Sequence, residues 1–191
     1  MRQNRQAGFT LIETLIVVAI VVILVGIGAA NLIPTIRNSR ADRAVQTVLQ
    51  EMRRARQQAL DERRIFIITF IPPRSIRVQR REIGGALTLL RQTDLPQDIS
   101  FQILPQVPVG GASTPDNFGT GAVAIDFNGG TQIFFQPDGS AQDALGQINN
   151  GVVYLGRTND ALSARAVSMF GATGRVKSWT LRREANTYVW R

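Results

Sequence analysis

The 191-residue chain contains no cysteine and no histidine. The lack of cysteine excludes disulfide bonds and thiol nucleophiles, and the lack of histidine excludes Ser-His-Asp triads and most zinc sites. Its 14 acidic residues are scattered, and no D-x-[DN]-x-[DN]-G calcium loop occurs. We therefore expect no cofactor and no resident metal. One alternative stays open, a calcium site assembled in three dimensions from Asp126, Asp138 and Asp160.

Negative charge is also scarce relative to positive charge. The 14 Asp and Glu residues are outnumbered by 22 Lys and Arg residues, which gives a formal net charge of +8. A basic balance favours contact with anionic lipid surfaces or with nucleic acid. Twelve arginines lie within residues 37–81. A second cluster ends the chain and comprises Arg175, Lys177, Arg182, Arg183 and Arg191.

Charge is absent from the apolar run of residues 15–33 near the N-terminus. Its 19 residues would span close to the roughly 30 Å hydrocarbon core of a bilayer as a helix. The run is longer than the apolar region of a secretory signal peptide, and no A-x-A-like cleavage site follows it. Arg2 and Arg5 precede it, so the positive-inside rule predicts a cytoplasmic N-terminus and an exported C-terminal part.

Glu13 is a carboxylate at the start of this apolar segment, where an unpaired charge costs a few kcal/mol. No Lys, Arg or His lies between Phe9 and Ile36, so the partner must come from another subunit or from processing. Cleavage after Gly8 would free a cationic amine on Phe9, one helical turn from Glu13 and equally within reach of a neighbouring copy.

The string GFTLIE at residues 8–13, after a basic leader and before an apolar helix, resembles the class III signal of type IV pilins and type II secretion pseudopilins. The resemblance implies that a prepilin peptidase cleaves between Gly8 and Phe9 and that the Phe9 amine is then methylated. It also implies that Glu13, together with Phe9, docks one subunit onto another.

Beyond the run, apolar residues recur every three or four positions, which predicts an amphipathic helix over residues 34–62. They are Val45, Val48, Leu49, Met52, Ala55, Ala59 and Leu60. The polar face between them carries Gln46, Gln50, Arg53, Arg54 and Gln57.

From residue 65 the pattern changes to short apolar or alternating runs, which predict strands. We expect them at 65–70, 75–80, 87–90, 99–104, 123–127, 132–135, 152–155, 166–170, 176–181 and 188–190. The sequence Asn128-Gly129-Gly130 predicts a hairpin between the flanking strands. Residues 105–121 are rich in Pro, Gly, Ser and Thr, and we expect a mobile or protruding loop there.

The expected fold class is α+β: a long N-terminal helix, half in the membrane and half amphipathic, packed on an antiparallel β-sandwich-like domain of about 8–10 short strands. The predicted divisions are a cleaved leader (1–8), a transmembrane or filament-core helix (9–33), its amphipathic continuation (34–62) and a periplasmic β domain (63–191).

Two C-terminal segments resemble the H-type minor pseudopilins, the GspH/FimT-like group. One is IFFQPDGS at residues 133–140; the other is the predicted strand pair 166–179 with its GATGR connection. The resemblance implies a non-enzymatic subunit at or near the tip of a periplasmic pseudopilus of a type II secretion system, which assists export of folded proteins. It implies a bacterial inner-membrane location. The implied partners are other pseudopilins, the prepilin peptidase, the inner-membrane assembly platform and the bilayer.

Two other functions stay open. A minor pilin of a type IV pilus, acting in pilus assembly or in DNA uptake, would bind DNA through Arg175, Lys177, Arg182 and Arg183, with Trp179 and Trp190 stacking on single strands. An anchored hydrolase would pair the carboxylates of Asp126 and Asp138 across a cleft.

Overall fold

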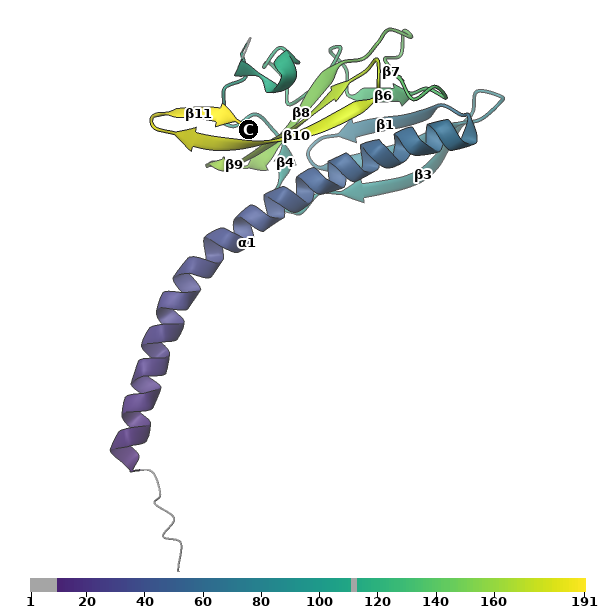
Figure 1. Ribbon diagram of the computed structural model, residues 1–191. Coiled ribbons are helices and arrows are strands. Elements are labelled where there is room, and N and C mark those ends of the chain that lie inside the picture. The colour runs from purple at the N-terminus through teal and green to yellow at the C-terminus, as the bar shows by residue number, and fades with distance from the viewer. Residues whose placement is uncertain (1–9, 111–112) are drawn as a thin grey trace, which may run out of the picture. The chain divides into compact units, whose positions relative to one another are not determined.

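The computed structural model describes residues 10–110 and 113–191, with the side chains of residues 27–37 excepted. The chain divides into two compact units, Met1–Asn38 and Ser39–Arg191. A single helix, α1 (Leu11–Glu62), contributes to both units (Figure 1). It ends where Arg63 adopts a φ of 51°, the left-handed conformation in which helices commonly terminate.

The strands of the second unit form two antiparallel sheets, which confirms the predicted α+β class. The five-stranded sheet has the order β3-β2-β1-β6-β7. Its strands are β1 (Phe66–Ile71), β2 (Ser75–Arg81), β3 (Leu87–Asp94), β6 (Gln132–Phe135) and β7 (Ala141–Gln142).

The six-stranded sheet has the order β11-β10-β9-β8-β4, and its sixth strand, β5, also pairs with β8. Its strands are β4 (Ser100–Phe101), β5 (Ile125–Phe127), β8 (Gly151–Arg157), β9 (Asp160–Phe170), β10 (Arg175–Glu184) and β11 (Thr187–Trp190).

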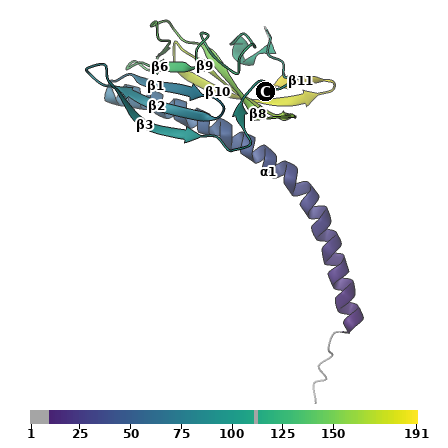
Figure 2. The same ribbon diagram turned by 180° about the vertical axis from the view of Figure 1, so that it is seen from behind.

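The amphipathic part of α1 buries its apolar stripe in the main core of this unit, where it meets residues of both sheets. Figure 2 shows β1, β2 and β3 alongside this part of the helix. The buried helix residues are Ala41, Ala44, Val45, Val48, Leu49, Met52, Ala55 and Ala59. The predicted polar face is exposed, and Leu60, at the end of the predicted stripe, is half-buried. Burial of one face at a 3.6-residue period thus places the helix on the sheets.

A second apolar core lies on the opposite face of the six-stranded sheet. Alternate residues of β8 divide between the cores, with Val153 in the main one and Tyr154 in the second. Leu104 and Val107 cover this second core, and the Trp190 indole N–H donates to the Pro108 carbonyl at 2.9 Å. The expectation of a protruding loop over 105–121 is therefore wrong for its first part, because the sheet has a second apolar face that this segment buries.

The expected hairpin at Asn128-Gly129-Gly130 is a turn, but the strands on its two sides do not pair as a hairpin. Phe127 and Gly130 exchange two backbone hydrogen bonds of 3.1 and 3.0 Å. Beyond them, β5 pairs with β8 whereas β6 pairs with β1. The hairpin prediction is thus wrong, because local turn residues fix the chain reversal while burial of each strand selects its partner.

Candidate functional site

The N-terminal signal lies partly outside the described residues: Gly8 and Phe9 fall there, and Glu13 is the first of the predicted site residues inside. Glu13 is in the first turn of α1 and is exposed. Its carboxylate has no ion pair or hydrogen bond within the described part of the chain. A partner for this charge therefore has to come from outside that part.

The backbone at this end of the helix is capped by Thr10, whose Oγ1 accepts a hydrogen bond from the Glu13 N–H at 3.3 Å. Thr10 and Glu13 have the T-x-x-E spacing of a capping box, in which the glutamate occupies the third helical position. The sequence interpretation missed this cap by Thr10, although the spacing alone carries the signal; the Glu13 carboxylate does not make the reciprocal bond of the box within the described residues. Docking and capping have to be separated by experiment.

Twelve large apolar side chains of the first unit are each at least 50% exposed. They are Leu11, Ile12, Leu15, Ile16, Val17, Val18, Ile20, Val21, Val22, Ile23, Leu24 and Val25. Within the described residues, no helix is long and apolar enough to cross a bilayer.

In the second unit, ion pairs tie α1 to the sheets, and two of them reach strands far away in sequence. Arg91 of β3 bonds to Glu51, whose other oxygen accepts from the Thr93 hydroxyl at 3.1 Å. Arg165 of β9 bonds to Asp42 at 2.8 Å, and its guanidinium side chain is only 6% exposed. Each pair joins a helix residue to a strand far away in sequence, so the helix is fixed in position as well as buried.

The two segments that resemble H-type pseudopilins meet at one helix residue, Arg56. The Arg56 Nε donates to the Gly139 carbonyl at 3.0 Å. A Cβ at Gly174, where φ is +62°, would collide with the Gly139 carbonyl and with Arg56 Nε at 2.5 Å. The Pro-Asp-Gly turn and the GATGR connection therefore pack on each other and on the helix, which is a structural role for both glycines.

The four residues predicted to contact DNA all lie on β10, and all four are exposed. Lys177 is engaged, since its ammonium lies 3.5 Å from the ring centroid of Trp179 and 3.9 Å from an oxygen of Asp116. Arg182 and Arg183 are consecutive in the strand and so point to opposite faces of the sheet. The strand aligns the four residues in a row without gathering them into one patch.

The tryptophans proposed to stack on nucleic acid are held by the protein. Trp190 is 7% exposed and bonded to Pro108. Trp179 is half-buried, and its indole N–H donates to the Ser168 hydroxyl at 2.9 Å. Neither indole is presented as a free platform for bases.

The carboxylates considered for hydrolysis are both bonded to nearby groups of the chain. Asp126 is 5% exposed and accepts hydrogen bonds from the Thr120 N–H (2.8 Å) and hydroxyl (2.9 Å) and from the Gly129 N–H (3.1 Å). Burial opposes its ionisation, but these donors hold the pKa of Asp126 below its usual value. Ser140, whose backbone N–H donates to Asp138 at 2.8 Å, likewise lowers the pKa of Asp138. Both carboxylates serve turns, as expected for Asp in loops.

The described residues contain no cluster of three or more His, Cys, Asp or Glu side chains that could hold a metal ion. Close to Asp126, Tyr154 is buried, and burial together with the Asp126 charge raises its pKa to about 12. Tyr154 belongs to the second core rather than to an open site.

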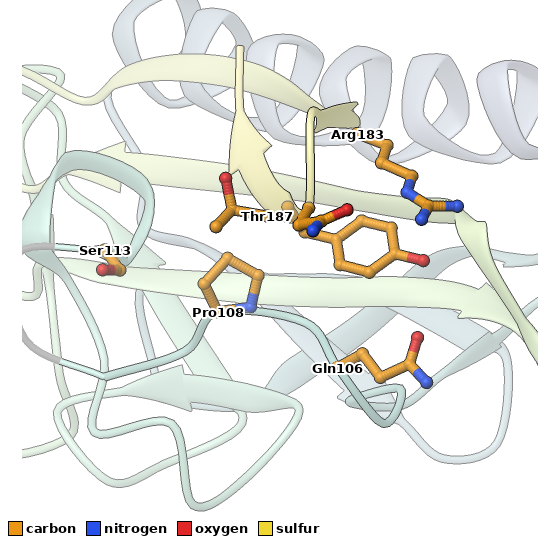
Figure 3. A pocket seen from close by; sticks show the side chains of 7 residues that line it. Gln106, Pro108, Ser113, Arg183 and Thr187 are labelled. Carbon is orange, nitrogen blue, oxygen red and sulfur yellow. The ribbon is translucent and has the colours of Figure 1, made fainter.

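An open cavity that the sequence interpretation missed lies between β11 and the segment that covers the second core (Figure 3). Its volume is about 820 Å³, and Pro108, Ser113, Arg183 and Thr187 are among its lining residues. A second cavity of about 400 Å³ shares Pro108 and Ser113 with it and continues along β11 to Trp190. No sequence motif marks this place, because it is created by the loop and the strand together.

Comparison with known proteins gives a sequence match at the N-terminus and similarities to solved structures. Residues 3–29 match the model of the prokaryotic N-terminal methylation motif, which confirms the resemblance drawn from residues 8–13. No protein of curated function matches the sequence.

Two of the similar structures are of a minor pseudopilin, EpsH, of the type 2 secretion system of Vibrio cholerae. One structure has a TM-score of 0.48 and 10% identity, and the match covers 74% of this chain and 97% of that chain. A crystal structure of EpsH has a TM-score of 0.49 and 11% identity, with coverage of 77% of this chain and 98% of that chain.

Proposed function

We propose that this protein is a minor pseudopilin of a type II protein secretion system. In this function it is a non-enzymatic subunit at or near the tip of a periplasmic pseudopilus that assists the export of folded proteins. The observation that carries the proposal is the N-terminal methylation motif followed by an exposed carboxylate, Glu13, on a helix with exposed apolar side chains.

Processing creates the partner that Glu13 lacks. Cleavage by a prepilin peptidase after Gly8 leaves a methylated, cationic amine on Phe9. In the filament, the Glu13 carboxylate of one subunit forms an ion pair with this Phe9 amine of its neighbour. The pair is formed where apolar helices exclude water, so either charge left alone would cost several kcal/mol. This cost fixes the axial position of one subunit against the next.

Before assembly, the apolar helix anchors the subunit in the bacterial inner membrane, with Arg2 and Arg5 on the cytoplasmic side. The β domain then lies in the periplasm. The inner-membrane assembly platform moves the helix from lipid into the filament core, where helices of neighbouring subunits cover the apolar side chains of residues 11–25.

The assignment to a minor, H-type subunit is supported by the segments 133–140 and 166–179, which resemble that group. Their contact at Arg56 and Gly139 builds the junction between the helix and the β domain. The β domain is exposed along the filament and contacts other minor subunits or the exported protein.

Two variants, made in the organism that produces the protein, test the docking role of Glu13. Glu13→Gln removes the charge but keeps a side chain suited to the capping box, whereas Thr10→Ala removes the cap and keeps the charge. We expect Glu13→Gln to lower the yield of secreted proteins at least about tenfold, because an unpaired amine is left in the filament core. We expect Thr10→Ala to lower it about twofold or less. The reverse order of effects would mean that the helix cap at Thr10 matters more than the charge of Glu13, and would overturn the proposal.

A type IV pilus minor pilin that takes up DNA is the second candidate. The observation in its favour is that Arg182 and Arg183 are exposed and have no ion pair within the described residues. DNA bound through phosphate contacts would dissociate steeply with rising salt. If the purified full chain in detergent does not retard double-stranded DNA in a gel at low salt, this candidate is excluded.

A further inference from the structure

The free edges of the two sheets differ in their capacity to accept another strand. The edge strands are β3 and β7 in one sheet and β4, β5 and β11 in the other. Strands β4 and β7 have two residues each, too few to template a partner, and β5 has three residues, all of them buried. Strand β3 is longer, but a bulge at Leu90 shifts its register against β2, and bulges protect edges against pairing. Among the described strands, β11 is the regular open edge.

The outer side of β11 presents backbone donors and acceptors at Tyr188 and Trp190. Thr180 and Arg191 exchange two hydrogen bonds of 2.8 and 3.0 Å. In an antiparallel ladder such pairs alternate, so Thr187 and Val189 direct their N–H and C=O groups toward β10. The same groups of Tyr188 and Trp190 therefore point away from the sheet, where the described chain offers no strand partner.

The cavities beside this edge provide room for the side chains of an added strand. The larger one, of about 820 Å³, is lined by Arg183, Asn186, Thr187 and Tyr188 on one side and by Gln106, Pro108 and Ser113 on the other. In Figure 3 the labelled side chains of Arg183, Thr187, Pro108 and Gln106 surround this space. A strand laid along β11 would place every second side chain in it, which supplies specificity in strand addition.

Charge at this edge selects the partner. Two carboxylates near the edge are already paired, Glu184 with Arg191 at 2.9 Å and Asp116 with Lys177. Arg183, which lines the cavity, and Arg182 have no ion pair within the described residues. Strand β11 itself carries no charge, and a second copy of this edge would bring its own Arg182 and Arg183, so it would add positive charge rather than neutralise it. An acidic strand would neutralise these arginines.

We propose that β11 is a docking edge for an extended, acidic segment of a different protein chain, which joins the six-stranded sheet as an additional strand. The backbone of this segment pairs with Tyr188 and Trp190, and one of its carboxylates binds Arg183 beside Pro108. This docking edge deepens the proposed function. It rests on that function in one respect: a subunit at the tip has to bind proteins other than copies of itself.

Photo-crosslinking of the full chain in its producing organism tests this proposal. Thr187 is replaced by p-benzoylphenylalanine, and Gln92 on the bulged edge β3 is replaced in the same way as a matched control. We expect a cross-link from position 187, and mass spectrometry to place it in an acidic, extended segment of another protein. A cross-link to a second copy of this chain, to a helix or to a basic segment would overturn the proposal, as would a yield no greater than that from position 92.

Variants of Tyr188 test whether the backbone makes the contact. Proline is tolerated on an edge strand where its nitrogen faces outward, so Tyr188→Pro keeps the pairing with β10 but removes the outward donor. Tyr188→Val removes the same aromatic ring and keeps the donor. We expect Tyr188→Pro to lower the cross-link at least about fivefold and Tyr188→Val about twofold or less. Equal losses in the two variants would overturn pairing through the backbone.

A charge reversal completes the test, and its result can be separated from that of the Glu13 experiment. We expect Arg183→Glu to lower the cross-link about tenfold, because it sets two carboxylates against each other. If secretion requires Glu13 but position 187 gives no cross-link, this inference fails and the proposed function stands. If the cross-link forms but Glu13→Gln secretes normally, the proposed function fails and the docking edge stands.

Discussion

The two parts of helix α1 expose their apolar side chains to different extents. In the first unit, residues such as Leu15 (63% exposed) and Val22 (64%) have open surface on all sides of the helix. In the second unit, Val48 and Met52 are completely buried against the sheets. The second part is therefore stabilised by its own chain, and the first part offers a surface that neighbouring subunits or lipid can cover. In the proposed function, one continuous helix thus serves assembly at one end and folding at the other.

Two carboxylates repeat this difference on the scale of single side chains. Asp126 is buried and accepts three hydrogen bonds from its own chain. Glu13 is exposed, and its carboxylate has no partner within the described residues. A change at Asp126 should therefore alter folding, and a change at Glu13 should alter assembly.

The largest effect on folding is expected from the core of the second unit. Phe70 is 1% exposed, stacks on Phe127 at 5.5 Å and meets the edge of Phe101 at 5.6 Å, so it joins β1 to β5 and β4. We expect Phe70→Ala to lower the free energy of unfolding by about 3–5 kcal/mol, because it leaves a cavity. Urea denaturation of the full chain in detergent, followed by tryptophan fluorescence, measures this.

Leu15→Ala is the matched control in the first unit. It also removes a large apolar side chain, but an exposed one, and we expect a change within about 0.5 kcal/mol. A comparable loss of stability in both variants would mean that the first unit takes part in the folding of the second, and would break the distinction between them.

A smaller effect is expected at the junction of the helix with the two turns. Gly174→Ala combines a left-handed φ of +62° with a Cβ that would collide with Gly139 and Arg56. Gly129→Ala has a φ of +77° but no atom within 4 Å of the added Cβ. We expect a loss of about 1–2 kcal/mol for Gly129→Ala from backbone strain alone, and about 3 kcal/mol for Gly174→Ala.

The same denaturation measurement decides between strain and packing at this junction. Equal losses in the two variants would show that Gly174 is required only for its backbone conformation. In that case the contact between Arg56 and Gly139 would not be what holds the two turns on the helix.

The sequence predicts the elements of this fold well where burial follows a period. The stripe from Val45 to Ala59 is buried as expected, and the ten predicted strands all overlap observed ones. The predicted strand at residues 99–104 is reduced to Ser100–Phe101. Predictions from periodic patterns succeed because the polarity of each residue indicates whether its face of the helix or sheet is buried.

Features that depend on tertiary contacts were missed. The strand β7 has two residues and no pattern of its own; it exists because Ala141 and Gln142 pair with Phe135 and Phe134. The docking edge at β11 requires Pro108, some 80 positions earlier in the chain, to lie beside it. The predicted site residue Glu13 followed from chemistry that is local in sequence, whereas the cavity did not.

The smallest expected effect concerns the pH dependence of folding. The pKa of Asp126 in the folded protein lies below its unfolded value, which is about 3.9. The ionised carboxylate therefore contributes stability above that pH, and the contribution is lost as pH falls through the folded pKa. We expect Asp126→Asn to be less stable at pH 7 and to show a shallower loss of stability below about pH 4.

Thr120→Val separates the donors from the charge in this prediction. It removes the hydroxyl that donates to Asp126 at 2.9 Å and keeps both the carboxylate and the Thr120 backbone donor position. Urea denaturation from pH 3 to pH 7 measures how the free energy of unfolding falls at acid pH. For Thr120→Val this fall should be intermediate between that of the wild type and that of Asp126→Asn, because fewer donors lower the pKa of Asp126 less. If all three proteins lost stability with the same slope below pH 4, the stabilisation of Asp126 by its own chain would be refuted, and this carboxylate would no longer differ from Glu13 in how its charge is satisfied.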